Sequence, residues 1–159
     1  MSKILLNSKS IARIAAIQAI YQINCAGLGN MDVMTSLARI VDFYKDKNLK
    51  NDHEINDDIP LKIKPSHSFL KELAKLTHDN INDINGIISG YLNNDRKITS
   101  LSKMLLTLLQ VAISELKFYP ETPKNVIINE YTDIANDMLN SGEVGFVNSV
   151  LDRFSSGQK

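Results

Sequence analysis

Several features that define common protein classes are missing from this sequence. Cys25 is the only cysteine, so the chain cannot form an internal disulfide or a thiolate zinc cluster. The 18 Lys and Arg residues equal the 18 Asp and Glu residues, so no overall positive charge attracts nucleic acid. No apolar run reaches the roughly 18 residues that a membrane-spanning helix needs, and no signal peptide follows Met1. These absences predict a soluble cytoplasmic protein in which any nucleic-acid binding depends on a local group of cations.

Motifs for catalysis are absent as well. No GxSxG, GxxxxGKS or GxGxxG pattern occurs, so the backbone turns that these chemistries require are missing. The histidines His53, His67 and His78 lack the spacing that brings two imidazoles to one metal ion. Glu130 and Asp133 lie three residues apart, but solvation or a structural hydrogen bond explains them better than a shared proton. We therefore expect no catalytic residue, no metal and no cofactor.

What the sequence does contain is a helical spacing of apolar residues along nearly its whole length. The segment Ser8–Cys25 is apolar almost all round, as in a helix buried among neighbours, and Cys25 is expected to be a small buried thiol. Leu101–Leu116 is predicted to be the central helix. Five more helices are predicted around the apolar residues of Val33–Tyr44, Phe69–Leu76, Ile84–Leu92, Ile127–Met138 and Phe146–Phe154. The residues expected to cap helices are Asn30, Ser66, Thr99 and Thr122.

These helices predict an all-α fold, a single-domain bundle of about seven helices spanning residues 1–159. A polar stretch at about residues 45–65 interrupts the pattern, with four acids between flanking lysines and with Pro60 and Pro65 at its end. Its composition predicts a variable loop.

The N-terminal charge pattern points to a function. Residues 1–31 contain Lys3, Lys9 and Arg13 but no Asp or Glu. Cations at the start of a helix oppose its dipole by about 0.3 to 1 kcal/mol each, which makes more sense if a phosphate binds there. Tyr21 lies eight residues after Arg13, close to the same helix face, where its ring can stack on a base. The pattern indicates RNA contact; a solvated tail and a half-buried Tyr21 are the alternative.

Three stretches of the sequence, Ala12–Tyr21, Ile128–Glu130 and Phe146–Arg153, resemble the NusB family of bacterial antitermination factors. Leu109–Leu116 is similar to the central helix of that family. The resemblance covers nearly the whole chain outside residues 45–64, and it implies an all-helical fold and a non-enzymatic role. NusB proteins pair with NusE, a small-subunit ribosomal protein, and the pair binds the boxA element of nascent ribosomal RNA in the RNA polymerase antitermination complex.

The resemblance also implies which residues contact RNA. The residues at the matching positions, with Lys3 added on charge alone, are Lys3, Lys9, Arg13, Gln18, Tyr21, Phe146 and Asn148. Cations are fewer than in relatives: Ser10 and Ile11 interrupt the arginine run, Gly145 replaces a common lysine and Gln110 replaces an arginine. With three cations on phosphates, the salt slope on single-stranded RNA should be about −2. We therefore expect weak RNA binding by the chain alone and stronger binding together with NusE.

Two other functions stay open on the sequence. The chain can be a scaffold that keeps its protein partner and has lost RNA binding. It can also be a stand-alone relative of the RNA-binding domain of ribosomal RNA cytosine methyltransferases, although these 159 residues contain no Rossmann-like catalytic domain. The apolar surface of a bundle is compatible with a homodimer or with the heterodimer, and no membrane contact is expected.

Overall fold

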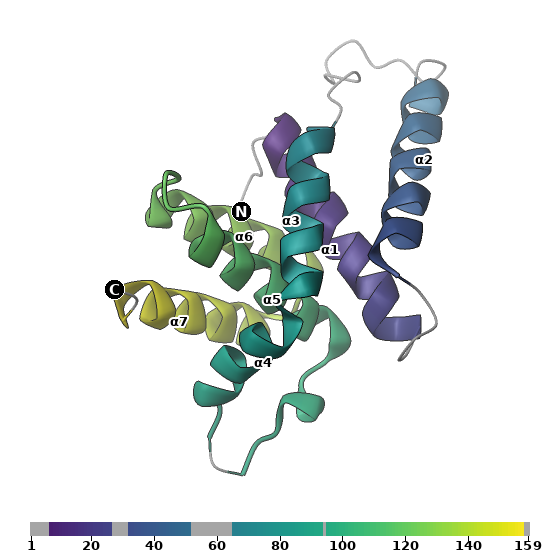
Figure 1. Ribbon diagram of the computed structural model, residues 1–159. Helices are drawn as coiled ribbons and strands as arrows, with labels where there is room; N and C mark the ends of the chain where they lie inside the picture. The colour runs from purple at the N-terminus through teal and green to yellow at the C-terminus, as the bar shows by residue number, and fades with distance from the viewer. Residues whose placement is uncertain (1–6, 27–31, 52–64, 94, 158–159) are drawn as a thin grey trace.

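The computed structural model describes residues 7–26, 32–51, 65–93 and 95–157, with the side chains of 45–51 left out. Over this part of the chain it forms seven α-helices and one 3-10 turn and no strand, which confirms the predicted all-α bundle (Figure 1). The elements are α1 (Ser8–Ala26), α2 (Val33–Asn51), α3 (His67–Asp79), α4 (Ile81–Gly90), η1 (Ile98–Ser100), α5 (Lys103–Phe118), α6 (Lys124–Met138) and α7 (Ser141–Gly157).

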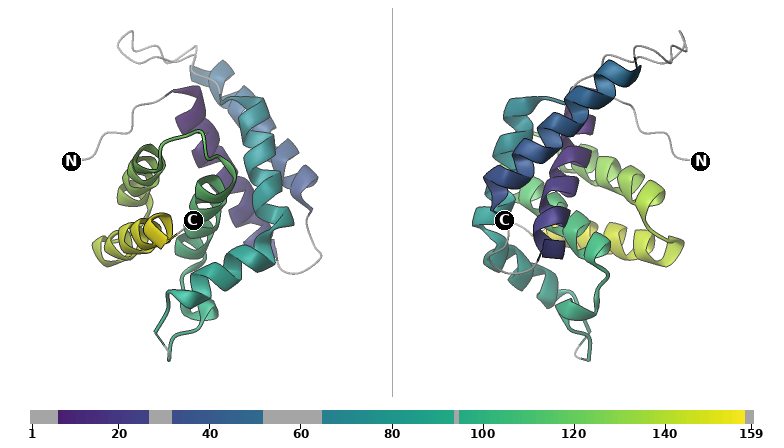
Figure 2. Two further views of the ribbon diagram at one scale, coloured as in Figure 1. Left: turned by 60° about the vertical axis from the view of Figure 1, so that its left-hand side comes forward. Right: turned by 90° about the vertical axis from the view of Figure 1, so that its right-hand side faces the viewer.

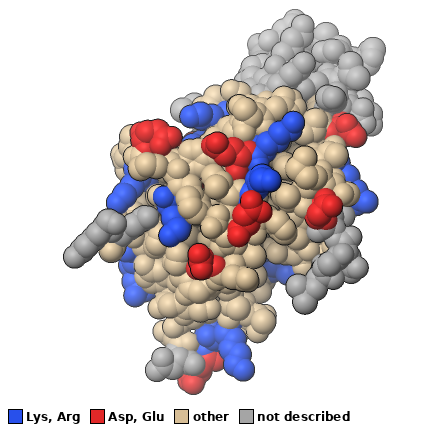
Figure 3. Space-filling model, viewed as in Figure 1, with Lys and Arg blue, Asp and Glu red and all other residues tan. Residues whose placement is uncertain are grey.

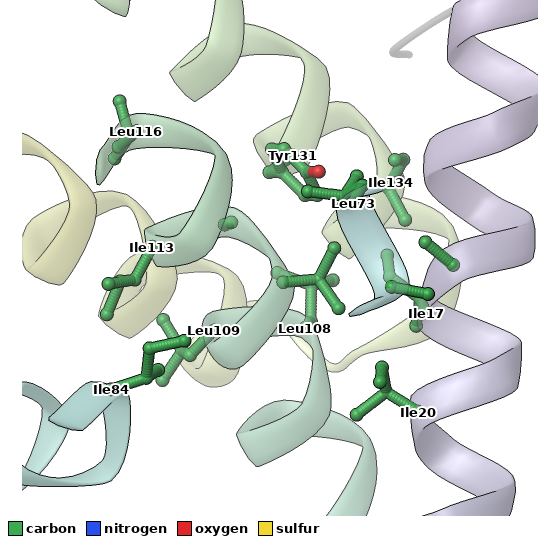
Figure 4. Packing of buried hydrophobic residues seen from close by; sticks show 14 of the residues in the cluster. Ile17, Ile20, Leu73, Ile84, Leu108, Leu109, Ile113, Leu116, Tyr131 and Ile134 are labelled. Carbon is green, nitrogen blue, oxygen red and sulfur yellow. The ribbon is translucent and has the colours of Figure 1, made fainter. Parts of the chain in front are cut away.

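Helix α5 is the centre of the bundle, as its apolar pattern predicts. Every residue from Thr107 to Leu116 is buried, and the helix packs against α1, α3, α4, α6 and α7. Leu108 and Leu109 point toward side chains of the surrounding helices, among them Ile17 of α1 and Ile84 of α4 (Figure 4). A helix enclosed on all sides fixes the relative positions of its neighbours, because its side chains interlock with theirs.

The other helices lie on different sides of α5. Helices α1, α2 and α3 pack together on one side, and α6 and α7 form a pair on the other (Figures 1 and 2). Helix α4 continues from α3 and contacts both α5 and the η1 turn. Residues near the start of α1 and residues of α6, more than 100 positions apart in the chain, thereby become neighbours.

A buried amide fastens the C-terminal end of α1 to α5 and α4. Gln110 is 1% exposed, and its Oε1 accepts a hydrogen bond from Asn24 Nδ2 at 3.0 Å. Gln110 Nε2 donates to Asn85 Oδ1 at 2.8 Å. Gln110 thus joins three helices without carrying a charge.

The structure corrects several expected helix ends. Helix α2 begins after Asp32, whose Oδ1 accepts the Thr35 N–H at 2.7 Å, while the expected cap Asn30 lies outside the described residues. The same helix continues to Asn51, so the first part of the expected loop is helical, and residues 52–64 lie outside the described residues.

Two other expected caps differ in position, and a third lacks its capping hydrogen bond. Ser102, not Thr99, caps α5, accepting a hydrogen bond from Leu105 N at 3.2 Å. Pro123 rather than Thr122 occupies the N-cap position of α6. Ser66 is at the predicted N-cap position of α3, but its side chain makes no capping hydrogen bond.

Candidate functional site

A buried ion cluster surrounds Arg13 in the second turn of α1. The side chain of Glu115 from α5 has no exposed surface, and its Oε2 lies 2.7 Å from Arg13 Nη2 while its Oε1 accepts from Arg13 Nε at 2.9 Å. Arg13 Nη1 donates to Glu130 Oε1 of α6 at 2.9 Å. The hydroxyl of Ser10 donates to the same Glu130 oxygen at 2.7 Å, and the hydroxyl of Tyr131 donates to Glu115 Oε1 at 2.7 Å. The cluster therefore joins α1, α5 and α6.

The environment of Arg13 keeps its guanidinium charged. Burial acts to lower the pKa of Arg13, but the hydrogen bonds and negative charge of Glu115 outweigh it and raise the pKa above its ordinary value. The sequence places Arg13 on the RNA face, and this expectation needs correction: the residue is 4% exposed and its donors already meet two carboxylates. Glu130 accepts structural hydrogen bonds from Ser10 and Arg13, as its sequence context predicts.

Lys9 lies at the exposed start of α1. Its Nζ is 5.3 Å from the centroid of the Phe69 ring, a cation–π distance that leaves the ammonium group at the surface. The other N-terminal candidate, Lys3, lies outside the described residues. Among the described residues of α1, Lys9 is therefore the cation that an RNA phosphate can reach.

Gln18 and Tyr21 lie further along α1, beside α2. Both are half-buried, and both border a groove that Arg39 and Phe43 of α2 also line. A hydrogen bond with Cys25, one turn later, raises the pKa of the Tyr21 phenol. Cys25 itself is exposed, so the expectation of a buried thiol is wrong: the helix end at which it stands is not covered. Tyr21 and Lys9 are twelve residues apart, about 18 Å along the helix axis.

Phe146 and Asn148 lie in the first half of α7. Phe146 is partly exposed, and the guanidinium carbon of Arg96 lies 5.4 Å from the centroid of its ring. Asn148 is exposed, and Thr132 Oγ1 lies 3.5 Å from its Oδ1. Two residues apart on a helix, the two side chains point in different directions. Phe146 with Arg96 therefore forms an aromatic and cationic pair at the surface, and Asn148 lies apart from it.

The first turn of α5 lies between the Tyr21 and Phe146 regions. Met104 borders the groove beside Tyr21, and Ser102 Oγ donates to Glu143 Oε2 of α7 at 2.9 Å. Lys103 is exposed between them. Tyr21, the start of α5 and Phe146 therefore follow one another in space, in this order, along one end of the bundle.

Sequence reasoning missed Arg39 and Arg96. Neither belongs to an apolar period or to a stretch resembling the family, and each becomes relevant only through a distant aromatic residue. The one local sign of a cationic site is the run Asp95-Arg96-Lys97, which lies directly before η1. In this run the acid partly offsets the two cations. On the face shown in Figure 3, cationic and acidic residues are interspersed, in agreement with the zero formal charge.

The described part of the chain offers neither a metal-ion site nor a membrane-spanning helix. Its His, Cys, Asp and Glu side chains form no group of three that could hold a metal ion. None of its helices is both long and apolar enough to cross a membrane.

Comparisons with known proteins agree on one family. Residues 10–156 match the model of the NusB family. The chain is 46% identical over 159 residues to the transcription antitermination protein NusB of Rickettsia bellii, covering 100% of this chain and 97% of the relative. It is 47% identical over 155 residues to NusB of Rickettsia rickettsii, covering 98% of this chain and 96% of the relative.

Solved structures show the same fold at lower identity. T. maritima NusB superimposes with a TM-score of 0.74 at 22% identity, covering 96% of this chain and 94% of that one. A chain from a crystal structure of the antitermination factors NusB and NusE with double-stranded RNA gives 0.70 at 19% identity, covering 92% and 95%. The chain belongs to the NusB family.

Proposed function

We propose that this protein is a transcription antitermination factor that pairs with the ribosomal protein NusE and binds boxA-type RNA during ribosomal RNA transcription. The observation that carries the proposal is the 46% identity to a transcription antitermination protein over nearly the full length of both chains. The fold shared with a NusB chain from a complex with NusE and RNA supports the same partners. The matched relatives are antitermination proteins, and the match covers 96% or more of their length. A function derived from a methyltransferase therefore has less support.

The exposed residues suggest how the RNA is held. Tyr21 and Phe146 offer ring faces on which unpaired bases can stack, and Lys9 and Arg96 offer cations to phosphates. Gln18 and Asn148 can hydrogen-bond base edges from their half-buried and exposed positions. Arg13 acts indirectly, because its ion cluster holds the first turns of α1 against α6. Binding of this kind involves no covalent step, so the proposed role is non-enzymatic and belongs in the cytoplasm, where the transcript is made.

The test is a titration of the protein with labelled boxA RNA at graded salt, with and without NusE. We expect weak binding alone, and with NusE a clear preference for boxA over a scrambled strand of the same length. Tyr21→Ala should weaken the complex by about 5- to 100-fold through loss of stacking. Equal affinity for boxA and scrambled RNA in the presence of NusE would contradict the RNA role.

Two observations favour a second function, a scaffold that binds NusE without RNA. Arg13 is already paired with carboxylates, and Gly145 adds no cation to the one that Arg96 provides beside Phe146. The same titration distinguishes the two, since the scaffold binds NusE normally but shows no salt-sensitive binding of RNA.

A further inference from the structure

A groove of about 430 Å³ lies between α1 and α2 at the start of α5. Tyr21 and Gln18 form its α1 side, Arg39 and Phe43 its α2 side, and Met104 closes it from α5. Helices α1 and α2 run beside each other in both Figure 1 and Figure 2. The volume lies within the range of about 300 to 1,000 Å³ that small-ligand sites occupy.

The surfaces of the groove suit a base and a phosphate. Phe43 is 49% exposed and Tyr21 is half-buried, so both present ring surface to a ligand. Met104 adds a polarizable thioether. Arg39 is exposed and carries the charge of the site, and no Asp or Glu is among the described residues that line it. Asp42, beside Phe43 in the chain, is exposed outside the lining.

The Gln18 amide has a fixed direction within the groove. Tyr44, half-buried on α2, donates its hydroxyl to Gln18 Oε1 at 3.0 Å. With the oxygen engaged, the Nε2 group offers its two N–H donors to a ligand. A keto oxygen at a base edge accepts such a hydrogen bond, whereas an exocyclic amino group does not. Both pyrimidines carry a keto oxygen at position 2, but at position 4 uracil has a keto oxygen and cytosine has an amino group. A pyrimidine that meets the Gln18 N–H groups with its position-4 edge is therefore uracil.

We propose that this groove holds one nucleotide of single-stranded RNA, with the base against Tyr21 and Phe43, the 4-keto oxygen of uracil on Gln18 and the phosphate on Arg39. The inference rests on the proposed function and adds to it residues of α2 and a preference for uracil. An aromatic groove of this size also admits a side chain of a protein partner. The effects of Phe43→Ala on RNA binding and on NusE binding distinguish a nucleotide from a protein side chain.

The first experiment measures the anisotropy of labelled decauridylate and decacytidylate with the full chain and its variants. We expect tighter binding of decauridylate. Phe43→Ala should weaken binding of both strands by about 5- to 100-fold if the ring stacks on a base. Arg39→Gln should weaken both strands and make the salt slope shallower by about 0.7, the contribution of one phosphate on a single strand.

Lys117→Gln is the matched charge control. Lys117 is exposed at the far end of α5, thirteen residues and about 20 Å from Met104. Its loss should leave both the affinity and the salt slope unchanged. Equal effects of Arg39→Gln and Lys117→Gln would show a general charge effect and overturn the assignment of Arg39.

Tyr44→Phe tests the role of the fixed amide. This variant removes only the hydroxyl that holds Gln18, so the stacking surface and Arg39 remain. We expect the preference for decauridylate, about 2- to 10-fold for one hydrogen bond, to shrink while the salt slope stays the same. An undiminished preference in Tyr44→Phe, or no preference in the unaltered chain, overturns the positioning of Gln18.

Cys25 provides a direct readout of occupancy. It is the only cysteine in the sequence, it is exposed, and it lies one helical turn after Tyr21 on α1. Saturating decauridylate should slow alkylation of Cys25, and Arg39→Gln should require more RNA for the same protection. An unchanged alkylation rate at saturation would overturn the inference.

Failure of the inference differs from failure of the proposed function. If the unaltered chain binds no RNA even with NusE, the proposed function is wrong. If it binds RNA and the variants of Arg39 and Phe43 bind as well as it does, the groove alone is misassigned. If Phe43→Ala weakens binding of NusE and leaves RNA affinity unchanged, the occupant is a protein side chain and the inference is again overturned.

Discussion

Among single residues, Arg13 has the largest expected effect on stability, because it is the charge partner of a carboxylate without solvent contact. Glu115 is 0% exposed, and Arg13 engages both of its oxygens. Arg13→Met keeps the aliphatic bulk and leaves Glu115 buried and without its cation. We expect the free energy of unfolding, measured in urea, to fall by about 3 to 5 kcal/mol.

A double variant is the control for this prediction. Adding Glu115→Gln to Arg13→Met removes the uncompensated charge, so the double variant should be more stable than the sum of the single effects predicts. A change below about 0.5 kcal/mol in Arg13→Met, typical of a surface position, would contradict the burial of its charge.

Tyr131 gives the molecule an alkaline limit. Burial first, and then the charge of Glu115, raise the pKa of the Tyr131 phenol well above its ordinary value of 10.0. In the unfolded chain this phenol ionises near pH 10, while in the folded protein it stays protonated, so the free energy of unfolding falls as pH rises above that value. Tyr131→Phe should flatten this fall in urea titrations between about pH 8 and pH 11. A slope equal to that of the parent would show that other tyrosines carry the effect.

Gly145 is a position at which RNA binding can be increased. A Cβ there meets no atom within 4 Å, and the residue is exposed beside Phe146. Gly145→Lys should tighten boxA binding and steepen the salt slope by about 0.7, since it adds one cation. Gly157→Lys, at an equally open position twelve residues later in α7, is the matched control and should leave RNA binding unchanged. Indistinguishable slopes for the two variants would remove Phe146 from the RNA path.

Among the helices, α5 shows what local sequence can and cannot specify. Its apolar spacing correctly predicts a central buried helix, whereas its expected cap, Thr99, is wrong. Thr99 and Ser102 are both good capping residues, and the choice depends on η1 and on Glu143 of α7, which accepts the Ser102 hydroxyl. No local pattern contains a contact across 41 residues.

The two candidate caps provide a matched comparison of stability. Ser102→Ala should lower the free energy of unfolding by about 1 kcal/mol, because the Leu105 N–H loses its partner. Thr99→Ala should change it by less than about 0.5 kcal/mol, as expected for an exposed residue without a capping bond. Thermal or urea unfolding checks both values, and the reverse order would support the cap predicted from sequence.

At the scale of the whole molecule, sequence reasoning identified suitable residue types but could not place them. The sequence predicts that Lys9, Arg13 and Tyr21 all contact RNA. Glu115, 102 residues after Arg13, removes the guanidinium from the surface, and the length of α1 separates Lys9 from Tyr21 by about 18 Å. The exposed cation beside Tyr21 is instead Arg39, from a helix whose own pattern indicated only an apolar face.

This separation makes the effects of Lys9 and Arg39 depend on RNA length. A stacked trinucleotide spans about 7 Å and a decamer about 31 Å, so only the decamer reaches both positions. With the decamer, Lys9→Gln and Arg39→Gln should each make the salt slope shallower by about 0.7, and their effects on the free energy of binding should add, because the sites share no contacts. With triuridylate, Arg39→Gln should weaken binding and Lys9→Gln should not. Equal sensitivity of the trinucleotide to both variants would mean that the two ends of α1 do not bind separate parts of the strand.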